Sequence, residues 1–489
     1  MQDTCIPTSM ALTNSNFGNF CLFMTAWLLM SVTLYNFVLL NPLAPAMRTM
    51  YETTHMNRYN ETMPEEKWTV LYAVSVSCVY FGAIVGGVGT NFMLSYVSRK
   101  GLMQLSHVIN IIGVIVIALV AGTTWSYEAL IIGRIIAGIP LGVAYNLPIL
   151  MMAELSAKCK QNFWQSVVGL SVAFGILIGS IFSHPKILGS LSLWTVLVSL
   201  AVIPSLIYLI SSHWIPNTPF YVLRTYGKDE ALEVLKKLRQ GTLDEIKEEL
   251  SSMSDEIGGK RKVLIKEMLT TKNFRNMFAG VVALFLNLVL VGIDNILLYS
   301  DKVFIEAGIS PDKATFATIG VFAMQLLASL VGSKLVDRFG GFKVHVASNI
   351  LIIFAHVTYT VSQVATPAAP NAMPYVAIFA VGVFLIAWSG GTNLTTFALL
   401  GEITSEPTRS TAYGYSAVIF WVVAWTVGFV PPYLQIHLGP YALTIWLGCA
   451  ILFLIYFIIF IPRLKRLRHK DDDLFMESKN DMEIKKLNC

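Results

Sequence analysis

Residues 127–149, YEALIIGRIIAGIPLGVAYNLPI, decide the fold class of this chain. The stretch contains only two charged residues, Glu128 and Arg134, and it is long enough to cross the hydrocarbon core of a bilayer as an α-helix. A membrane-spanning strand needs only about ten residues and alternates apolar with polar side chains. Because only helices and closed barrels satisfy the backbone in lipid, this run predicts a transmembrane helix.

Similar runs occur on both sides of this stretch. Hydrophobic residues make up 55% of the chain and charged residues 13%, a balance that a water-soluble protein of 489 residues could not bury. We therefore predict an all-α membrane protein with twelve transmembrane helices in two six-helix bundles. The predicted spans are 18–40, 69–91, 102–121, 127–149, 163–184, 190–211, 277–299, 313–333, 343–363, 374–400, 411–434 and 439–462.

Basic residues concentrate in the connections that follow even-numbered spans. By the positive-inside rule, both termini and the long central connection are expected to be cytoplasmic. The net charge of +5 is explained by this topology, so no nucleic-acid partner is implied. The first twenty residues lack the pattern of a removable signal peptide, and we expect the first span to direct insertion itself. The basic residues are Arg99, Lys100, Lys158, Lys160, Lys334, Arg338, Lys343, Arg409, Arg463, Lys465, Arg466 and Arg468.

The spans divide six and six around a charged central segment. We predict an N-terminal bundle over 1–212, a linker over 213–276, a C-terminal bundle over 277–465 and a cytoplasmic tail over 466–489, irregular beyond Lys470. Apolar residues in the linker have helical spacing, which favours short amphipathic helices against the cytoplasmic face over a fully solvated connection. These residues are Ala231, Leu232, Leu235 and Leu238.

Glycine, proline and polar residues interrupt the first, fourth, seventh and tenth spans, which are equivalent positions in two halves of six. Helices broken at membrane depth are tolerated where they face protein or a water-filled cavity. Repeated halves are also how many transporters achieve alternating access, so a central pathway is indicated. The interruptions include Tyr35, Asn36, Asn41, Pro42, Gly138, Pro140, Tyr145, Asn146, Gly292, Asp294, Asn295, Tyr299, Gly390, Gly391, Asn393 and Thr396.

Short motifs along the chain resemble the sugar-porter branch of the major facilitator superfamily, which includes the animal facilitative glucose transporters. The resemblance extends from the first span to the last, and it implies the major facilitator fold, a plasma-membrane location and a sugar or polyol as solute. The motifs are Tyr35-Asn36 with Asn41, Gly133-Arg134 with Gly138, Glu154-Leu-Ser, Pro216 with Pro219, Lys236-Lys-Leu-Arg239, Gly292-Ile-Asp294 with Tyr299-Ser, Val336-Asp337-Arg338-Phe-Gly340, Glu402 and Arg409.

The resemblance also implies where solute and gates would lie. The expected solute-facing residues are Asn36, Asn41, Gly169, Leu288, Asp294, Asn295, Tyr299, Gln325, Asn393, Phe397, Phe420 and Trp421. The expected gating residues are Arg99, Lys100, Arg134, Glu154, Asp337, Arg338, Glu402 and Arg409. A purely topological role is the alternative for the second set, because charges collect at membrane boundaries in any case.

Several solute-facing positions depart from the family pattern. Leu288-Val289 replaces a glutamine pair, Gly169 replaces a glutamine and Phe397 replaces a tryptophan. Each lost hydrogen bond to a hydroxyl is worth about 0.5–1.5 kcal/mol, so three losses weaken glucose binding by roughly ten- to a thousandfold unless other contacts compensate. A more apolar or heterocyclic solute therefore stays open beside a sugar.

Asp294 is the most informative single residue, because a carboxylate at membrane depth is costly and usually paired, protonated or functional. Proton coupling, pairing with a cationic solute, acceptance from a solute hydroxyl, and a structural bond to Asn295 or a neighbouring helix all remain open. Acceptance of a hydrogen bond from a solute hydroxyl ranks first, since the family has asparagine at this position. His356 is read as a packed core histidine.

The predicted function is facilitative transport of a small organic solute, with a sugar or polyol favoured, by alternating access. The alternatives are a proton-coupled symporter of a less polar solute that uses Asp294, and a non-transporting nutrient sensor. No Walker A motif, nucleophile–base pair or metal-ligand spacing is visible, so we expect no enzyme activity, cofactor or metal. The six cysteines suggest no disulfide framework. Asn60-Glu-Thr is a glycosylation sequon in a connection expected to be extracellular. The oligomeric state is not determined by the sequence.

Overall fold

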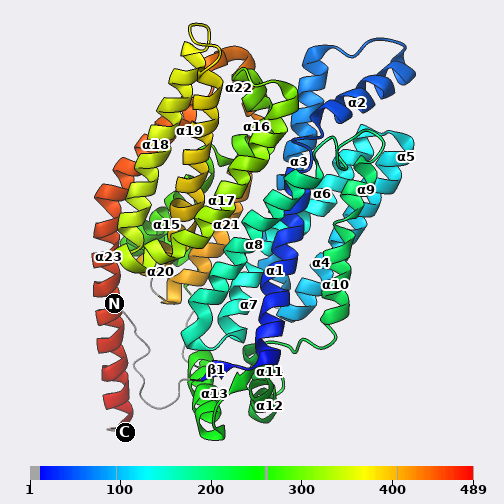
Figure 1. Ribbon diagram of the computed structural model, residues 1–489. Coiled ribbons are helices and arrows are strands. Elements are labelled where there is room, and N and C mark those ends of the chain that lie inside the picture. The colour runs from blue at the N-terminus through cyan, green and yellow to red at the C-terminus, as the bar shows by residue number, and fades with distance from the viewer. Residues whose placement is uncertain (1–11, 95, 259–262, 405, 488–489) are drawn as a thin grey trace.

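The computed structural model describes residues 12–94, 96–258, 263–404 and 406–487. Within these ranges, twelve helices are long and apolar enough to cross a membrane, which confirms the predicted fold class. The helices form two groups that stand side by side (Figure 1). Helix α2 (Ala44–Tyr59) lies at one end of the molecule, and the helices of the linker lie at the other. We call these the α2 end and the linker end.

The N-terminal bundle contains six spans, and two of them are interrupted by short non-helical segments. The fourth breaks at Tyr145 and Asn146, and the sixth breaks at Leu200 and Ala201. Its helices are α1 (Asn16–Val38), α3 (Glu65–Met93), α4 (Arg99–Ile115) with η1 (Val116–Ala121) and α5 (Gly122–Thr124), α6 (Tyr127–Ala144) with α7 (Leu147–Leu155), α8 (Gln161–Phe182), and α9 (Trp194–Ser199) with α10 (Val202–Ser211).

Two glycine pairs let α3 and α6 pack closely. Gly82 and Gly86 on α3 face Gly138 and Gly142 on α6, and a Cβ atom at Gly82 would lie 2.0 Å from the Ile135 carbonyl oxygen. Spacing of four residues places both glycines of each pair on one face of the helix, so the two backbones can approach without side chains between them. This contact fixes the fourth span in the centre of the bundle.

The C-terminal bundle repeats the arrangement. Its seventh span breaks at Val291 and Gly292, where Gly292 has a φ of 89° that favours glycine. Its helices are α15 (Lys272–Leu290) with α16 (Ile293–Glu306), α17 (Pro311–Phe339), α18 (Gly341–Ala365), α19 (Met373–Ala387) with η3 (Trp388–Asn393) and α20 (Leu394–Ile403), α21 (Glu406–Phe429), and α23 (Thr444–Leu487), with α22 (Pro431–Leu438) between the last two spans.

The prediction of an irregular tail beyond Lys470 is wrong. Helix α23 continues as far as Leu487 instead of ending near Lys470. No glycine or proline follows Pro462 in the sequence, so nothing in the backbone stops the helix once the apolar span has formed it.

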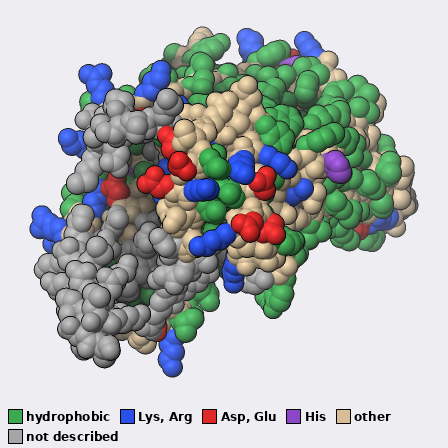
Figure 2. Space-filling model, turned by 90° about the horizontal axis from the view of Figure 1, so that it is seen from below, with side chains coloured by type: hydrophobic (Ala, Val, Ile, Leu, Met, Phe, Trp, Pro, Cys, Tyr) green, Lys and Arg blue, Asp and Glu red, His purple; other side chains and the backbone are tan. Residues whose placement is uncertain are grey.

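The linker forms four short helices. Three of them lie at one end of the N-terminal bundle: α11 (Pro219–Thr225), α12 (Lys228–Leu238) and α13 (Leu243–Gly258). The fourth, α14 (Ile265–Thr270), packs against α15 and α21 of the C-terminal bundle. Ala231 and Leu235 of α12 pack with Val222, Ile246 and Leu250 in a small core separate from the main one. Seen from this end, basic and acidic side chains are mixed over the surface (Figure 2).

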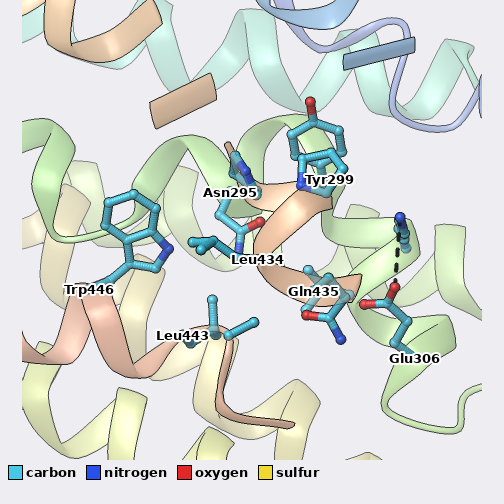
Figure 3. Close-up of a pocket in the computed structure, with 12 residues that line it drawn as sticks. Asn295, Tyr299, Glu306, Leu434, Gln435, Leu443 and Trp446 are labelled. Carbon is cyan, nitrogen blue, oxygen red and sulfur yellow. Dashed lines mark ion pairs between the residues drawn. The ribbon is translucent and has the colours of Figure 1, made fainter. Parts of the chain in front are cut away.

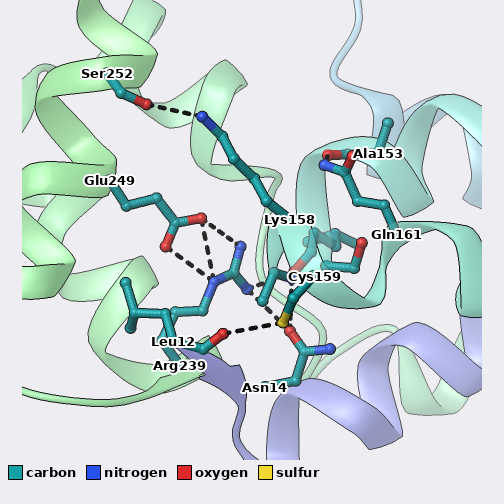
Figure 4. Close-up of polar contacts among 12 residues, drawn as sticks. Leu12, Asn14, Ala153, Lys158, Cys159, Gln161, Arg239, Glu249 and Ser252 are labelled. Atoms are coloured by element: carbon teal, nitrogen blue, oxygen red, sulfur yellow. Dashed lines mark hydrogen bonds and ion pairs between the residues drawn. The ribbon is translucent and has the colours of Figure 1, made fainter. Parts of the chain in front are cut away.

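A buried arginine ties the linker to the bundle. The segment β1 (Thr13–Asn14) pairs antiparallel with β2 (Arg239–Gln240). Arg239 is only 3% exposed; its guanidinium forms an ion pair with Glu249 at 2.9 Å and donates to the Leu155 carbonyl oxygen at the end of α7 at 2.6 Å (Figure 4). Asn14 Oδ1 accepts a hydrogen bond from the Ala157 amide at 2.8 Å. One side chain therefore holds the linker against the fourth span.

Candidate functional site

Two cavities enter the interface between the bundles from opposite ends. The linker-side cavity has an empty volume of about 1130 Å³, part of which is open to solvent, and the exposed side chains of Gln165 and Asp337 stand at its rim. Spans one, four, five, eight and ten contribute to its wall, whereas the seventh span does not. The lining residues are Met30, Tyr145, Ile149, Gln165, Ser166, Val168, Gly169, Val172, Ser333, Val336, Asp337, Asn393, Leu394, Phe397 and Ala398.

The α2-side cavity encloses about 1500 Å³ and is more highly charged. Arg48, Lys186, Lys302 and Asp312 line it together with Trp68. The hydrogen bond from Arg48 to Glu52, assisted by Glu65, raises the pKa of Arg48 above its usual value, so this rim residue stays charged. The cavity narrows inward to Asn41, Tyr72, Tyr299 and Asp301.

A layer of aromatic rings separates the two cavities. Tyr145, at the closed end of the linker-side cavity, lies with its ring centroid 4.8 Å from Trp421 and 5.4 Å from Phe420. Trp421 in turn contacts Tyr80, at 6.2 Å. These rings come from both bundles, so the layer can close only while the bundles are together at this level.

The layer continues to the α2-side cavity through α21. The backbone of Gly428 packs against the Tyr80 ring, and its carbonyl oxygen accepts a hydrogen bond from the Tyr299 hydroxyl at 2.9 Å. Tyr299 makes an edge contact with Tyr72 at 6.4 Å. A solute passing between the cavities must therefore displace Tyr145 on one side and Tyr299 on the other.

Asp294 lies within this layer, in the first turn of α16. Its side chain is buried, and the hydroxyls of Tyr80 and Tyr145 are its polar neighbours. The Tyr80 hydroxyl lies within hydrogen-bonding reach of the Asp294 carboxylate. Among the described residues, Asp294 Oδ2 and the Trp421 Nε1 group lack a hydrogen bond of good geometry. The layer thus holds one acceptor, Asp294 Oδ2, and one donor, Trp421 Nε1, with unused hydrogen-bonding capacity.

The break in the seventh span is stabilised by side chains of other helices. Trp388 Nε1 donates to the Leu288 carbonyl oxygen at 3.0 Å, and His356 Nε2 contacts the Val291 carbonyl oxygen at 2.9 Å. Carbonyl groups freed by the break are thereby satisfied away from water. His356 is buried and takes part in this bond, as expected of a packed histidine.

At the α2 end, Asn41 connects the bundles. Its Nδ2 group donates to Ser300 Oγ at 2.6 Å, and its Oδ1 atom accepts from the Asp301 amide at 3.2 Å. The Asp301 carboxylate accepts hydrogen bonds from Thr315 and Thr318, each at 2.5 Å. Sequence reasoning did not single out Asp301 or Tyr80; an acid inside an apolar span was the available signal for Asp301.

The expected solute-facing residues separate into groups. Gly169, Asn393 and Phe397 line the linker-side cavity; Asp294, Phe420 and Trp421 belong to the layer; Asn41 and Tyr299 line the α2-side cavity. Asn295 faces a third, smaller pocket of about 330 Å³ between α16, α22 and α23, beside Trp446 and Gln435 (Figure 3).

Three expected solute-facing residues lie away from both large cavities in this conformation. Asn36 donates to Asn110 Oδ1 at 2.8 Å inside the N-terminal bundle. Leu288 is buried near the break of the seventh span, and Gln325 is buried in the C-terminal bundle. Their role toward solute stays a prediction.

The expected gating residues lie mostly at the linker end. Arg99 forms an ion pair with Glu154 at 2.7 Å, and Glu402 forms one with Lys465, each within a single bundle. Lys100 lies beside Arg99 at the start of α4, and Arg338 stacks on Phe339. Arg134 is buried within α6, farther from the linker end, and donates to the Asn36 and Val76 carbonyl oxygens. The side chain of Arg409 lies outside the described residues.

The comparisons with known proteins agree with this architecture. Residues 21–473 match the family "Sugar (and other) transporter". The chain is 25% identical over 437 residues to the mouse facilitated glucose transporter member 7, covering 88% of this chain and 84% of that one. It is 27% identical over 436 residues to the horse facilitated glucose transporter member 5, covering 88% and 86%.

Solved structures show the same fold at lower identity. The proton:xylose symporter XylE bound to 6-bromo-6-deoxy-D-glucose superposes with a TM-score of 0.74 at 18% identity, covering 91% of this chain and 96% of that one. The inward-open XylE from E. coli gives a TM-score of 0.75 at 17% identity with the same coverage. The chain belongs to the sugar-porter family of membrane transporters within the major facilitator superfamily.

Proposed function

We propose that this transporter carries a sugar or polyol passively, by alternating access through the layer around Asp294. The observation that carries the proposal is the placement of broken helices: the fourth span breaks at Tyr145, a ring of the layer, and the seventh breaks at Gly292, two residues before Asp294. Discontinuous helices of this kind typically form the solute and ion sites of transporters with repeated halves.

The chemistry of the layer supports a polar solute that also has an apolar face able to pack against aromatic rings. Asp294 Oδ2 offers an acceptor and Trp421 Nε1 offers a donor, and neither group is satisfied by the described protein atoms. A buried polar group without a partner costs about 1–3 kcal/mol, so a solute that supplies the missing partners recovers that free energy. Gly169, Asn393 and Phe397 would receive the solute in the linker-side cavity before it reaches the layer.

Passive transport is favoured by the named relatives. The sequence relatives at 25% and 27% identity are facilitated glucose transporters, whereas XylE, a proton symporter, stands at 18% or less in the two comparisons above. The second candidate, proton coupling, rests on Asp294, a buried carboxylate located between two solvent-facing cavities.

We further propose that the linker end faces the cytoplasm, with both termini there, and that the protein resides in the plasma membrane. Asn60 supports this orientation, because it ends α2 in an exposed position at the opposite end from the linker. If this end is extracellular, Asn60 is accessible for glycosylation. Loss of a glycosidase-sensitive mobility shift in Asn60→Gln would support the assignment, and an unchanged shift would refute it.

Counterflow in proteoliposomes tests the proposed function. Vesicles loaded with unlabelled hexose should accumulate the labelled form without a proton gradient, and an imposed gradient or voltage should leave the initial rate unchanged. Stimulation by an inward proton gradient would instead identify a symporter. Saturable binding without counterflow would identify a sensor that has lost transport.

A further inference from the structure

The layer between the cavities combines one carboxylate with several aromatic rings. Asp294 is 6% exposed, and Tyr80 and Trp421 are each 2% exposed. Tyr80 and Tyr145, the polar neighbours of Asp294, both contact the Trp421 ring, at centroid distances of 6.2 and 4.8 Å. The carboxylate is therefore buried beside two tyrosines whose rings contact Trp421, and the faces of such rings carry partial negative charge.

Within the described residues, no positive side chain balances the Asp294 carboxylate. Asp294 forms no salt bridge with any Lys or Arg in the part of the chain that the structure describes. The basic residues on the two spans that carry Tyr145 and Asp294 have other partners. Arg134 donates to backbone carbonyl groups of the N-terminal bundle, and Lys302 pairs with Glu306 at 3.8 Å. The N-terminus of α16 provides only the partial charge of a helix end.

We propose that the layer recognises the ammonium group of a protonated amine carried by a sugar or polyol. This inference rests on the proposed function and specifies its substrate class. An ammonium bonded to the Asp294 carboxylate supplies the missing counter-charge, and the faces of Trp421, Tyr80 and Tyr145 surround it with cation–π contacts. The unpaired Trp421 Nε1 group is then left as a donor to an oxygen atom of the same solute.

Access to Asp294 is controlled by Tyr145. This residue lines the linker-side cavity and lies in the two-residue turn between α6 and α7. Rotation of its ring away from Trp421 and Phe420 opens the cavity onto the carboxylate. Neutral sugars reach the same place but gain no ion pair there.

Counterflow of radiolabelled D-glucosamine and D-glucose in proteoliposomes tests the inference, at a pH below the pKa of the amine. Wild-type protein should exchange glucosamine with about tenfold or greater preference. Asp294→Asn should lower glucosamine exchange by about ten- to a hundredfold while changing glucose exchange by less than about threefold. Asp244→Asn, which removes the same charge from the exposed linker, should change neither.

Binding measurements on purified protein distinguish a loss of solute recognition from a loss of folding. Asp294→Glu keeps the charge and should retain part of the glucosamine preference. Glucosamine should change the intrinsic fluorescence of purified protein, and the part of that change lost in Trp421→Phe should report binding at the layer, because the chain has ten tryptophans. Equal exchange of both sugars by wild type, with no selective effect of Asp294→Asn, would overturn the amine assignment and leave the proposed function intact. Absence of counterflow with either sugar, despite folded protein, would overturn both.

Discussion

Asn41 Nδ2 donates a hydrogen bond to Ser300 Oγ at 2.6 Å. This bond joins the turn that follows α1, the first span, to α16 in the seventh span of the other bundle. Asn41 Oδ1 accepts a second bond from the Asp301 amide. Both bonds are buried at the inner end of the α2-side cavity. The side chain therefore stabilises the conformation in which the bundles meet at this end.

Substitution Asn41→Ala should shift the population toward a conformation open at the α2 end. Two bonds worth about 0.5–1.5 kcal/mol each amount to about 1–3 kcal/mol, a shift of roughly 5- to 150-fold. The rate at which a membrane-impermeant maleimide modifies Thr69→Cys, in the wall of the α2-side cavity, should rise accordingly. Ser300→Ala should give a smaller effect and add little in the double variant; full additivity would show that the two residues act independently.

Gly292→Ala should destabilise the break in the seventh span. The φ of 89° costs a residue with a Cβ atom about 1–2 kcal/mol, and the new Cβ atom would lie 2.9 Å from the Trp446 ring, adding about 1–3 kcal/mol of overpacking. We expect a lower melting temperature in detergent and reduced counterflow. Gly320→Ala is the matched control, because a Cβ atom there meets nothing within 4 Å; equal losses in both variants would contradict this explanation.

His356→Phe should lower stability without moving the pH profile of transport. The substitution leaves the Val291 carbonyl oxygen without its donor, at a cost of about 1–3 kcal/mol. Trp388→Phe removes the equivalent bond to Leu288 and should have a similar effect on the melting temperature. A displaced pH optimum in His356→Phe, absent from Trp388→Phe, would identify the histidine as a proton carrier instead.

Arg239→Ala should release the linker from the N-terminal bundle. Removing one partner of a buried ion pair costs about 3–5 kcal/mol because Glu249 is left buried without its counter-charge. Limited proteolysis should then cut α12 and α13 faster while the spans remain protected. Lys236→Ala removes an exposed partner of Glu233 and should leave the cleavage rate unchanged. Equal protection of the linker in both variants would show that other contacts hold it.

The sequence was sufficient for the architecture because transmembrane helices are specified locally. Twelve apolar runs appear as twelve spans, and the clusters of glycine and polar residues in the fourth and seventh spans coincide with their breaks. The same local reasoning was wrong for the tail, where the helix of α23 continues. In that region charge composition argued against structure, but the absence of helix breakers allowed the last span to extend.

The grouping of the site residues was decided only by tertiary structure. Asp294 and Asn295 are neighbours in sequence, yet one lies in the aromatic layer and the other in the pocket beside Trp446, because successive residues of a helix point in different directions. The partners Tyr80, Ser300 and Gly428 come from distant spans, and no periodicity within one span reveals its neighbours. Hydrophobic length alone determined that the chain crosses the membrane twelve times, whereas packing between the two bundles decided which polar groups meet a solute.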